Sequence, residues 1–226
     1  KRMKTFNIEE TILYEDKDII VCQKPPAVAV QSRRVGSMDM EAALKNYFVK
    51  KGEEPYVGLV HRLDQPVQGI LVFGKNKEST AFLSRQLLND KMEKIYLACV
   101  EGIPFKKEAC LIDEIEKEQR TNLSKIVEKK TKNSKTAILE YRLLSSQGEY
   151  SLLEIHLKTG RHHQIRVQLA HAGLPIVGDA KYNLKAGQNR GQQEIALCAY
   201  KLSFVHPVTK KKLEFQVKPL GNFPIV

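Results

Sequence analysis

The pattern of apolar and polar positions along the chain predicts a central buried strand with a charged loop in front of it. Gly69–Phe73 is an uncharged run of five residues, typical of a strand covered on both faces. His61–Asp64, just before it, is mostly ionisable, and Pro66 cannot donate to a β-ladder. We therefore expect a loop that carries ionisable side chains to lead directly into a buried strand.

Further strands are expected on both sides of this one. Thr11–Leu13 and Asp18–Lys24 flank a polar turn, and Pro25 and Pro26 end the second strand because they lack backbone donors. Apolar runs bounded by turn residues predict the other strands. These are Lys94–Gly102, Thr136–Leu144, Tyr150–Lys158, Ile195–Phe204 and Lys212–Val217, with a turn at residues 145–148.

Helical spacing is limited to three stretches. Met38–Lys51 and Lys77–Asp90 are predicted helices, and a shorter one ends at Gly173, which suits the left-handed conformation of a helix C-terminus. Pro175–Tyr182 is expected as a tight ordered loop and Lys185–Gln193 as a mobile surface loop. Strands with few helices indicate an α+β fold. Near-helical spacing is seen for Ala81, Phe82, Ser84, Leu87 and Leu88 in the second helix. In the third, Ile165, Leu169 and Ala172 share a helical face.

The charge balance favours a polyanionic partner. Lys and Arg number 37 against 26 Asp and Glu, which gives a net charge of +11. Nucleic acid and an anionic membrane are the candidates, and a basic solubilising surface is the plain alternative. No apolar stretch approaches the roughly 18 residues of a membrane span, and no basic amphipathic helix stands out, so we expect no membrane partner. Lys117–Lys135 holds seven basic residues against two acidic ones, which predicts a hairpin or loop reaching toward nucleic acid, or a solvated face.

The cysteines indicate a reducing compartment. Their spacing fits neither a zinc site nor a disulfide framework, and they lie mostly in apolar, strand-like runs. No signal-peptide pattern opens the sequence. We therefore expect buried free thiols in a cytoplasmic protein, at Cys22, Cys99, Cys110 and Cys198.

Several stretches resemble the signatures of the RluA-type pseudouridine synthases. The first is His61–Asp64 with Pro66, Gly69 and the apolar strand that follows. The resemblance implies an α+β fold, with a single catalytic domain around a mixed, mainly antiparallel bent sheet flanked by helices and loops. We expect this domain over residues 11–218, without a separate N-terminal RNA-binding domain. The other matching stretches are Ile12–Pro25, Lys94–Gly102, and Thr159–Ala172 with Gly178, Asp179 and Tyr182 downstream.

The resemblance implies an RNA isomerase that converts specific uridines of structured ribosomal or transfer RNA into pseudouridine. Taken alone, Asp64 reads as a turn residue, but in this family the matching aspartate is the catalytic nucleophile. Arg166 would hold it ionised, and Tyr96 would stack on the uracil or transfer a proton. The reaction has no net redox change and no group donor, so we expect no cofactor and no metal, in a monomer whose partner is RNA. Implied substrate-binding residues are His61, Arg62, Leu63, Arg161, His163, Gln164 and Ile165, and candidates for the RNA backbone are Lys129, Lys130 and Lys132.

Some features leave alternatives open. Ala27 and Gln68 stand where the family usually has smaller residues. Gln68 keeps open the alternative that the protein binds RNA but has lost the reaction. Arg62 either fills the gap left by a flipped base or binds a phosphate, or it forms a buried structural ion pair. His61 and His163 are expected to orient loops by hydrogen bonds. A metal-dependent RNA hydrolase is the weakest alternative, because its only candidate ligands, His162, His163 and His171, lack acidic partners and suitable spacing.

Overall fold

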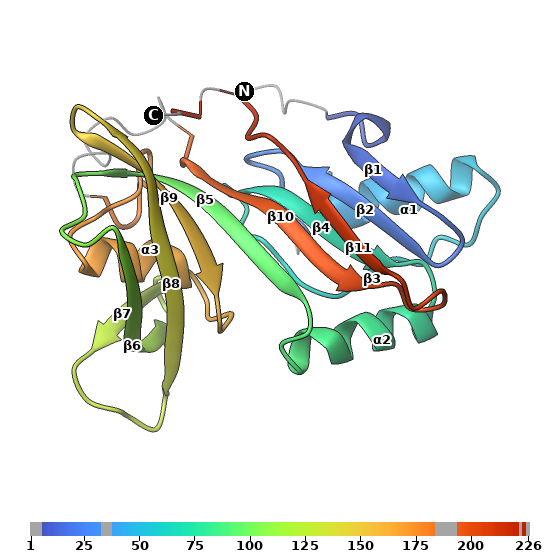
Figure 1. Cartoon of the computed structure of the whole chain (residues 1–226). Coiled ribbons are helices and arrows are strands. Elements are labelled where there is room, and N and C mark those ends of the chain that lie inside the picture. The colour runs from blue at the N-terminus through green and yellow to red at the C-terminus, as the bar shows by residue number, and fades with distance from the viewer. Residues whose placement is uncertain (1–5, 33–37, 184–193, 222, 225–226) are drawn as a thin grey trace. The chain divides into compact units, whose positions relative to one another are not determined.

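The computed structural model describes residues 6–32, 38–183, 194–221 and 223–224, so the loop predicted at Lys185–Gln193 lies outside the described residues. The chain forms two compact units, residues 1–94 with 199–220 and residues 95–198 with 221–226. Helices and antiparallel strand pairs occur in both units (Figure 1), which confirms the α+β class. The single catalytic domain over residues 11–218 stays a prediction.

The strands of the first unit are ordered β1-β2-β4-β10, with β3 paired to β4 and β11 paired to β10. The predicted central strand is confirmed, because all residues of β4 are buried. Its close neighbours leave no room for a side chain at Gly69, where a Cβ would lie 2.4 Å from the carbonyl oxygen of Ala199. The strands are β1 Ile12–Glu15, β2 Ile19–Lys24, β3 Gly58–Leu59, β4 Gln68–Gly74, β10 Leu197–Val205 and β11 Lys212–Gln216, preceded by a 3-10 turn η1 Glu9–Thr11.

The two helices of the first unit begin at capping residues. α1 (Met40–Lys50) starts after Asp39, whose side chain accepts from the amide of Ala42, and α2 (Lys77–Leu88) starts after Asn76. The side of β2 and β4 that faces α2 forms an apolar core. Its buried members are Ile19, Val21, Ile70, Val72, Leu83, Met92, Leu202 and Phe204.

The spacing expected along the second helix is only partly confirmed, since Leu87 packs against the core. Ala81 and Leu88 are exposed, and the buried stripe is Ser79, Leu83 and Gln86. Gln86 faces inward because its amide donates to the carbonyl of Val205 at 2.8 Å and accepts from the same residue's N–H at 2.7 Å. A polar side chain can take a core position when both of its hydrogen-bonding atoms are satisfied.

The strands of the second unit are ordered β5-β9-β8-β6-β7. The turn predicted between β8 and β9 is confirmed, but it lies at Gly148-Glu149 and not over residues 145–148, since β8 continues to Gln147. Gly148 has φ +58°. The longest strand that the sequence did not predict is β6, because acidic residues interrupt its apolar positions. The strands are β5 Glu93–Glu101, β6 Glu108–Glu118, β7 Leu123–Val127, β8 Ser134–Gln147 and β9 Tyr150–Leu157.

The third predicted helix is α3 (Gln164–His171), which packs against β6 and β7. Every residue from Gln164 to Leu169 is buried, so the helix has no single apolar stripe. Ala172 is exposed, which contradicts its predicted place on the apolar face. The loop after the helix is tight and ordered as predicted, because Val177 donates to Cys99 at 3.0 Å and accepts from Ala196 at 2.9 Å.

All four cysteines are free, and three of them are buried as expected. Cys110 is exposed, because it lies at a solvent-facing position of β6. None of the helices in the described residues is long and apolar enough to cross a membrane.

The close approach at Gly69 predicts a large loss of stability for Gly69→Ala. The residue has φ +130°, and an added Cβ would collide with the backbone of Ala199. We expect the free energy of unfolding to fall by about 2–5 kcal/mol, from left-handed strain and overpacking together. Gly148→Ala is the matched control, since its φ is +58° but a Cβ there has nothing within 4 Å, and it should cost only about 1 kcal/mol. Urea unfolding measures both, and equal losses would contradict the packing argument.

Candidate active site

The loop that carries Asp64 connects β3 to β4 in the first unit. The carbonyl of Asp64 accepts from the N–H of Val67 at 3.0 Å, which closes a tight turn just before the buried strand. Leu63 is buried and Asp64 is partly exposed. Because the turn is fixed by the start of β4, the backbone of Asp64 is held at a defined position.

His61 organises the same loop from its other end. Its Nε2 accepts from the N–H of Val72 at 3.3 Å, a group that lies beyond the short pairing of β3 with β4. Burial lowers the pKa of His61 to about 3, and the charge of Lys94 contributes. The ring is therefore neutral near pH 7 and can accept this bond. This geometry matches the expectation that His61 orients the loop.

Arg62, the residue after His61, lies at the surface of the protein. The residue is exposed, which rules out the buried structural ion pair considered for it. A solvent-facing guanidinium two residues before Asp64 remains available to a phosphate or to the gap beside a flipped base.

Lys24 lies beneath the loop, and the sequence analysis missed its role. It is fully buried, and its ammonium donates to three carbonyl oxygens, those of Pro25 at 3.0 Å, Val28 at 2.6 Å and Gln65 at 3.0 Å. Burial lowers the pKa of Lys24 to about 7, while the nearby charge of Asp64 acts in the opposite direction. The side chain ties the residue after Asp64 to the end of β2. A lysine at the end of a strand is usually exposed, so the sequence pattern did not predict that Lys24 is buried. Only Pro25 and Pro26, which follow it, indicated a turn here.

The second unit holds the other predicted site residues around the start of α3. Gln164 is buried, and its amide oxygen accepts from the hydroxyl of Thr159 at 2.8 Å and from the N–H of Arg161 at 2.9 Å. Its amide nitrogen donates to Ile138 at 3.1 Å. Both polar atoms of Gln164 thus shape the loop. Arg161 is exposed, with Nε bonded to the carbonyl of Thr136 at 2.9 Å, and Ile165 is buried.

Arg166 is held by Asp179 in a buried, two-point ion pair. The guanidinium donates through Nε at 2.8 Å to one carboxylate oxygen and through a terminal nitrogen at 2.6 Å to the other. Both side chains are nearly inaccessible, and the guanidinium lies 5.2 Å from the centre of the Tyr182 ring. Two parallel bonds fix the plane of a guanidinium, so this arginine is oriented before any substrate arrives. Its pairing with Asp64, a residue of the first unit, stays a prediction.

The neighbouring histidines bind hydroxyl groups. The hydroxyl of Tyr182 accepts from the N–H of Ser124 at 2.7 Å and lies 2.7 Å from Nδ1 of His163. Nδ1 of His162 lies 2.8 Å from the hydroxyl of Ser124, and the two imidazole rings stack at 3.8 Å. His171 is more than half exposed, 4.0 Å from Asp113. Ser124 therefore links β7 to the loop before α3.

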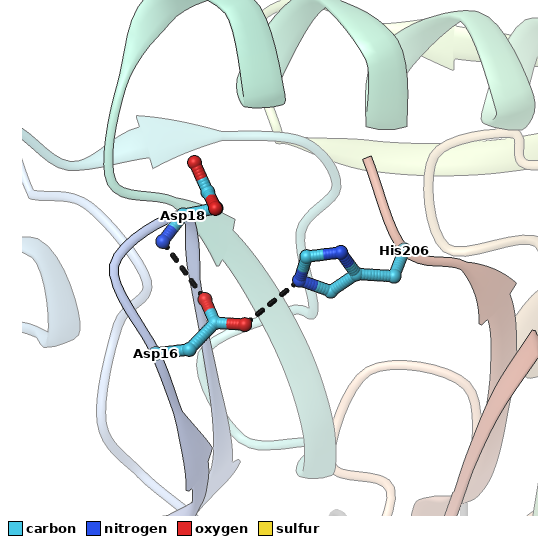
Figure 2. A group of neighbouring side chains, drawn as sticks. All are labelled: Asp16, Asp18 and His206. Atoms are coloured by element: carbon cyan, nitrogen blue, oxygen red, sulfur yellow. Dashed lines mark hydrogen bonds and ion pairs between the residues drawn. The ribbon is translucent and has the colours of Figure 1, made fainter. Parts of the chain in front are cut away.

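One cluster of possible metal ligands does occur in the described part of the chain, at Asp16, Asp18 and His206 (Figure 2). Its hydrogen bonds argue against a metal. One oxygen of Asp16 accepts from two backbone amides, and the other accepts from Tyr14 at 2.9 Å and from Nε2 of His206 at 2.8 Å. Nδ1 of His206 accepts from the amide of Thr209 at 3.0 Å, so Nε2 carries the proton. The cluster joins the β1–β2 turn to the β10–β11 turn.

The remaining predicted residues lie on β5 and in the basic segment. Tyr96, on β5, is buried with 7% of its surface exposed. The segment Lys117–Lys135 contains the end of β6, the whole of β7 and the loop to β8. That it reaches toward nucleic acid stays a prediction. Lys129, Lys130 and Lys132 are all exposed in that loop.

Comparison with known proteins places the chain in a family. The sequence profile described as RNA pseudouridylate synthase matches residues 18–171. An uncharacterized RNA pseudouridine synthase of Helicobacter pylori is 31% identical over 229 residues, which are 97% of this chain and 69% of that protein. Ribosomal large subunit pseudouridine synthase D of Borreliella burgdorferi is 33% identical over 206 residues, 88% of this chain and 62% of its own. tRNA pseudouridine synthase C of Haemophilus ducreyi is 32% identical over 224 residues, with coverages of 91% and 89%.

A solved structure shares the fold. Human RNA Pseudouridylate Synthase Domain Containing 4 superposes with a TM-score of 0.79 at 23% identity, covering 96% of this chain and 91% of that one. The chain therefore belongs to the RNA pseudouridylate synthases, a family of RNA uridine isomerases. Within that family it is of the RluA type, as the sequence signatures predicted. It spans only about two thirds of the length of the Helicobacter and Borreliella relatives.

Lys24 predicts a characteristic dependence of stability on pH. Its pKa is about 7 when folded against an ordinary 10.5, so between these values the unfolded chain binds more protons. Stability should therefore rise with pH above 7, by at most about 1.4 kcal/mol per unit. Lys24→Met removes this titration and leaves three carbonyls without their donor, so it should be less stable than wild type at every pH. Urea unfolding at pH 6, 7, 8 and 8.5 measures both proteins, and parallel profiles would show that Lys24 keeps an ordinary pKa.

Proposed function

We propose that this protein isomerises specific uridines of structured ribosomal or transfer RNA to pseudouridine, with Asp64 as the nucleophile. The observation that carries the proposal is the loop His61–Asp64. It presents a partly exposed aspartate from a turn fixed by Lys24, His61 and the first residues of β4. Family membership supplies the reaction class, and relatives with names for both ribosomal and transfer RNA support the substrate class.

The reaction exchanges one bond of the base for another. The bond from N1 of uracil to C1′ breaks, the base rotates, and a bond from C5 to C1′ forms, while the proton lost from C5 is balanced by one gained at N1. A carboxylate beside the sugar can act as a nucleophile or stabilise charge at C1′. Arg166 holds Asp64 ionised in this proposal, and its orientation by Asp179 supports that role because little rearrangement is needed. Tyr96 stacks on the uracil and assists proton transfer.

The target uridine has to leave its stack to reach Asp64, which costs a few kcal/mol. Arg62 is the residue best suited to offset this cost, since it is exposed and two positions from Asp64. Leu63 and Ile165 supply apolar surface for the base, and Arg161 and His163 complete the proposed substrate contacts.

An RNA-binding protein without activity is the second candidate, and the position of Gln68 weighs against it. This residue was the main departure from the family pattern near Asp64. Its amide is buried and bonds to the backbone of Leu220, with its oxygen accepting at 2.5 Å and its nitrogen donating at 3.1 Å. The larger side chain is therefore accommodated within the protein, which removes the reason to expect poor substrate fit.

Asp64→Asn tests the proposed function. It keeps the size of the side chain and removes its charge, so isomerisation of uridines in total cellular RNA should fall by about 10³-fold or more while RNA affinity stays near wild type. Asp90→Asn is the matched control, because that carboxylate is exposed and lies at a positive φ that Asn also tolerates. Pseudouridine is measured by nucleoside mass spectrometry, with and without a chelator. An active Asp64→Asn protein would assign the chemistry elsewhere. RNA cleavage without pseudouridine, abolished by the chelator, would favour metal-dependent hydrolysis.

The loop after β7 is proposed to contact the RNA backbone through Lys129, Lys130 and Lys132. Each phosphate contact contributes about 0.7–0.9 to the slope of log affinity against log salt. Replacing all three with Gln should therefore flatten this slope by about 2–3, as measured by filter binding between 50 and 300 mM salt (roughly the usable range). The control replaces three exposed lysines of the first unit, Lys50, Lys211 and Lys212. If both triple variants change the slope equally, the loop is only part of a general basic surface.

A further inference from the structure

The C-terminal segment, here residues 217–220, is bound by two glutamines from the strands around the Asp64 loop. Gln23 on β2 donates to the carbonyl of Lys218 at 2.9 Å. Gln68 on β4 makes both a donor and an acceptor bond to the backbone of Leu220, at 3.1 and 2.5 Å. The segment itself continues from β11, since Val217 donates to Tyr200 at 2.9 Å.

The bonds of Gln68 have the form of one step of a β-ladder in which a side-chain amide replaces one strand. Only 1% of Gln68 is exposed, so an unpaired amide there would lose its bonds to water without replacement. Leu220 satisfies both of its ends. The two residues are 152 positions apart in the sequence, so this contact exists only when the first unit is complete.

Gln68 lies where the Asp64 loop becomes a strand. Val67, the residue before it, donates to the carbonyl of Asp64, and Lys24 binds the carbonyl of Gln65. On the other side Gly69 is pressed against the backbone of Ala199. The loop exit is therefore restrained by Lys24 and β10, and the bonds to Leu220 add a third restraint.

We propose that the C-terminal segment positions the Asp64 loop, and that Gln68 is the positioning residue through which it acts. The inference rests on the proposed function, since it assigns the segment a role in aiming the nucleophile. A misplacement of about 1 Å at a reacting group can cost about 10²-fold in rate, so a restraint at the loop exit affects turnover more than RNA affinity.

The experiment compares three single variants and one double variant. Gln68→Ser removes both bonds, and Leu220→Pro removes the backbone N–H that donates to Gln68. Leu220→Ala is the matched control, because it changes the side chain and keeps both backbone groups. We expect the first two to lower kcat by about 10-fold or more with KM changed less than about 3-fold, and Leu220→Ala to behave as wild type. The double variant Gln68→Ser, Leu220→Pro should be no slower than the slower single, because both act through one contact.

A second measurement keeps the inference independent of activity. Hydrogen exchange at the amide of Val67, which bonds to Asp64, should quicken in Gln68→Ser and Leu220→Pro but not in Leu220→Ala. Thermal unfolding confirms that each variant is folded at the assay temperature. Unchanged exchange at Val67, or a lower melting temperature with unchanged kcat, would overturn the proposal. If wild type modifies no RNA but exchange still quickens, the proposed function fails while the restraint on the loop stands.

Discussion

A buried ammonium group surrounded by carbonyl oxygens is the constraint on which the Asp64 loop depends. Lys24 gathers the carbonyls of Pro25, Val28 and Gln65, which belong to two separate loops. Such an arrangement is costly to bury, and burial accordingly lowers the pKa of the lysine to about 7. Three acceptors around one donor nonetheless define a single geometry for both loops. The carboxylate of Asp64 is thus presented by a backbone that has little freedom.

The second unit uses a related device around Arg166. There the charge is paired directly, since Asp179 binds the guanidinium at two points, and Tyr182 lies against it. A buried pair of this kind adds little net stability, but breaking it is expensive, so it fixes orientation. In both units a charged group important to the proposed chemistry is aimed by contacts within the protein.

The sequence predicted the strands and helices that have strong patterns, and it failed where polar residues take core positions. The buried strand at Gly69–Phe73 was correct because an uncharged run has few alternatives. The buried face of α2 was only partly predicted, because Gln86 is buried through two hydrogen bonds to the backbone that the sequence pattern does not reveal. Similarly, β6 was missed because its acidic residues hide its apolar ones. The resemblance singled out Asp64 and Arg166, but Lys24, Ser124 and the bonds of Gln68 depend on contacts between residues far apart in the sequence.

The division of the chain has a consequence for its synthesis. The first unit needs residues 199–220, so its sheet keeps an open edge at β4 until β10 has left the ribosome. The bond between Asp16 and His206 spans 190 positions, so it too forms only after residue 206 has been synthesised. The second unit is built largely from one continuous stretch, residues 95–198, and can complete most of its contacts earlier. An unpaired, apolar strand edge is prone to aggregation, so the nascent chain should depend on chaperones during the interval between β4 and β10.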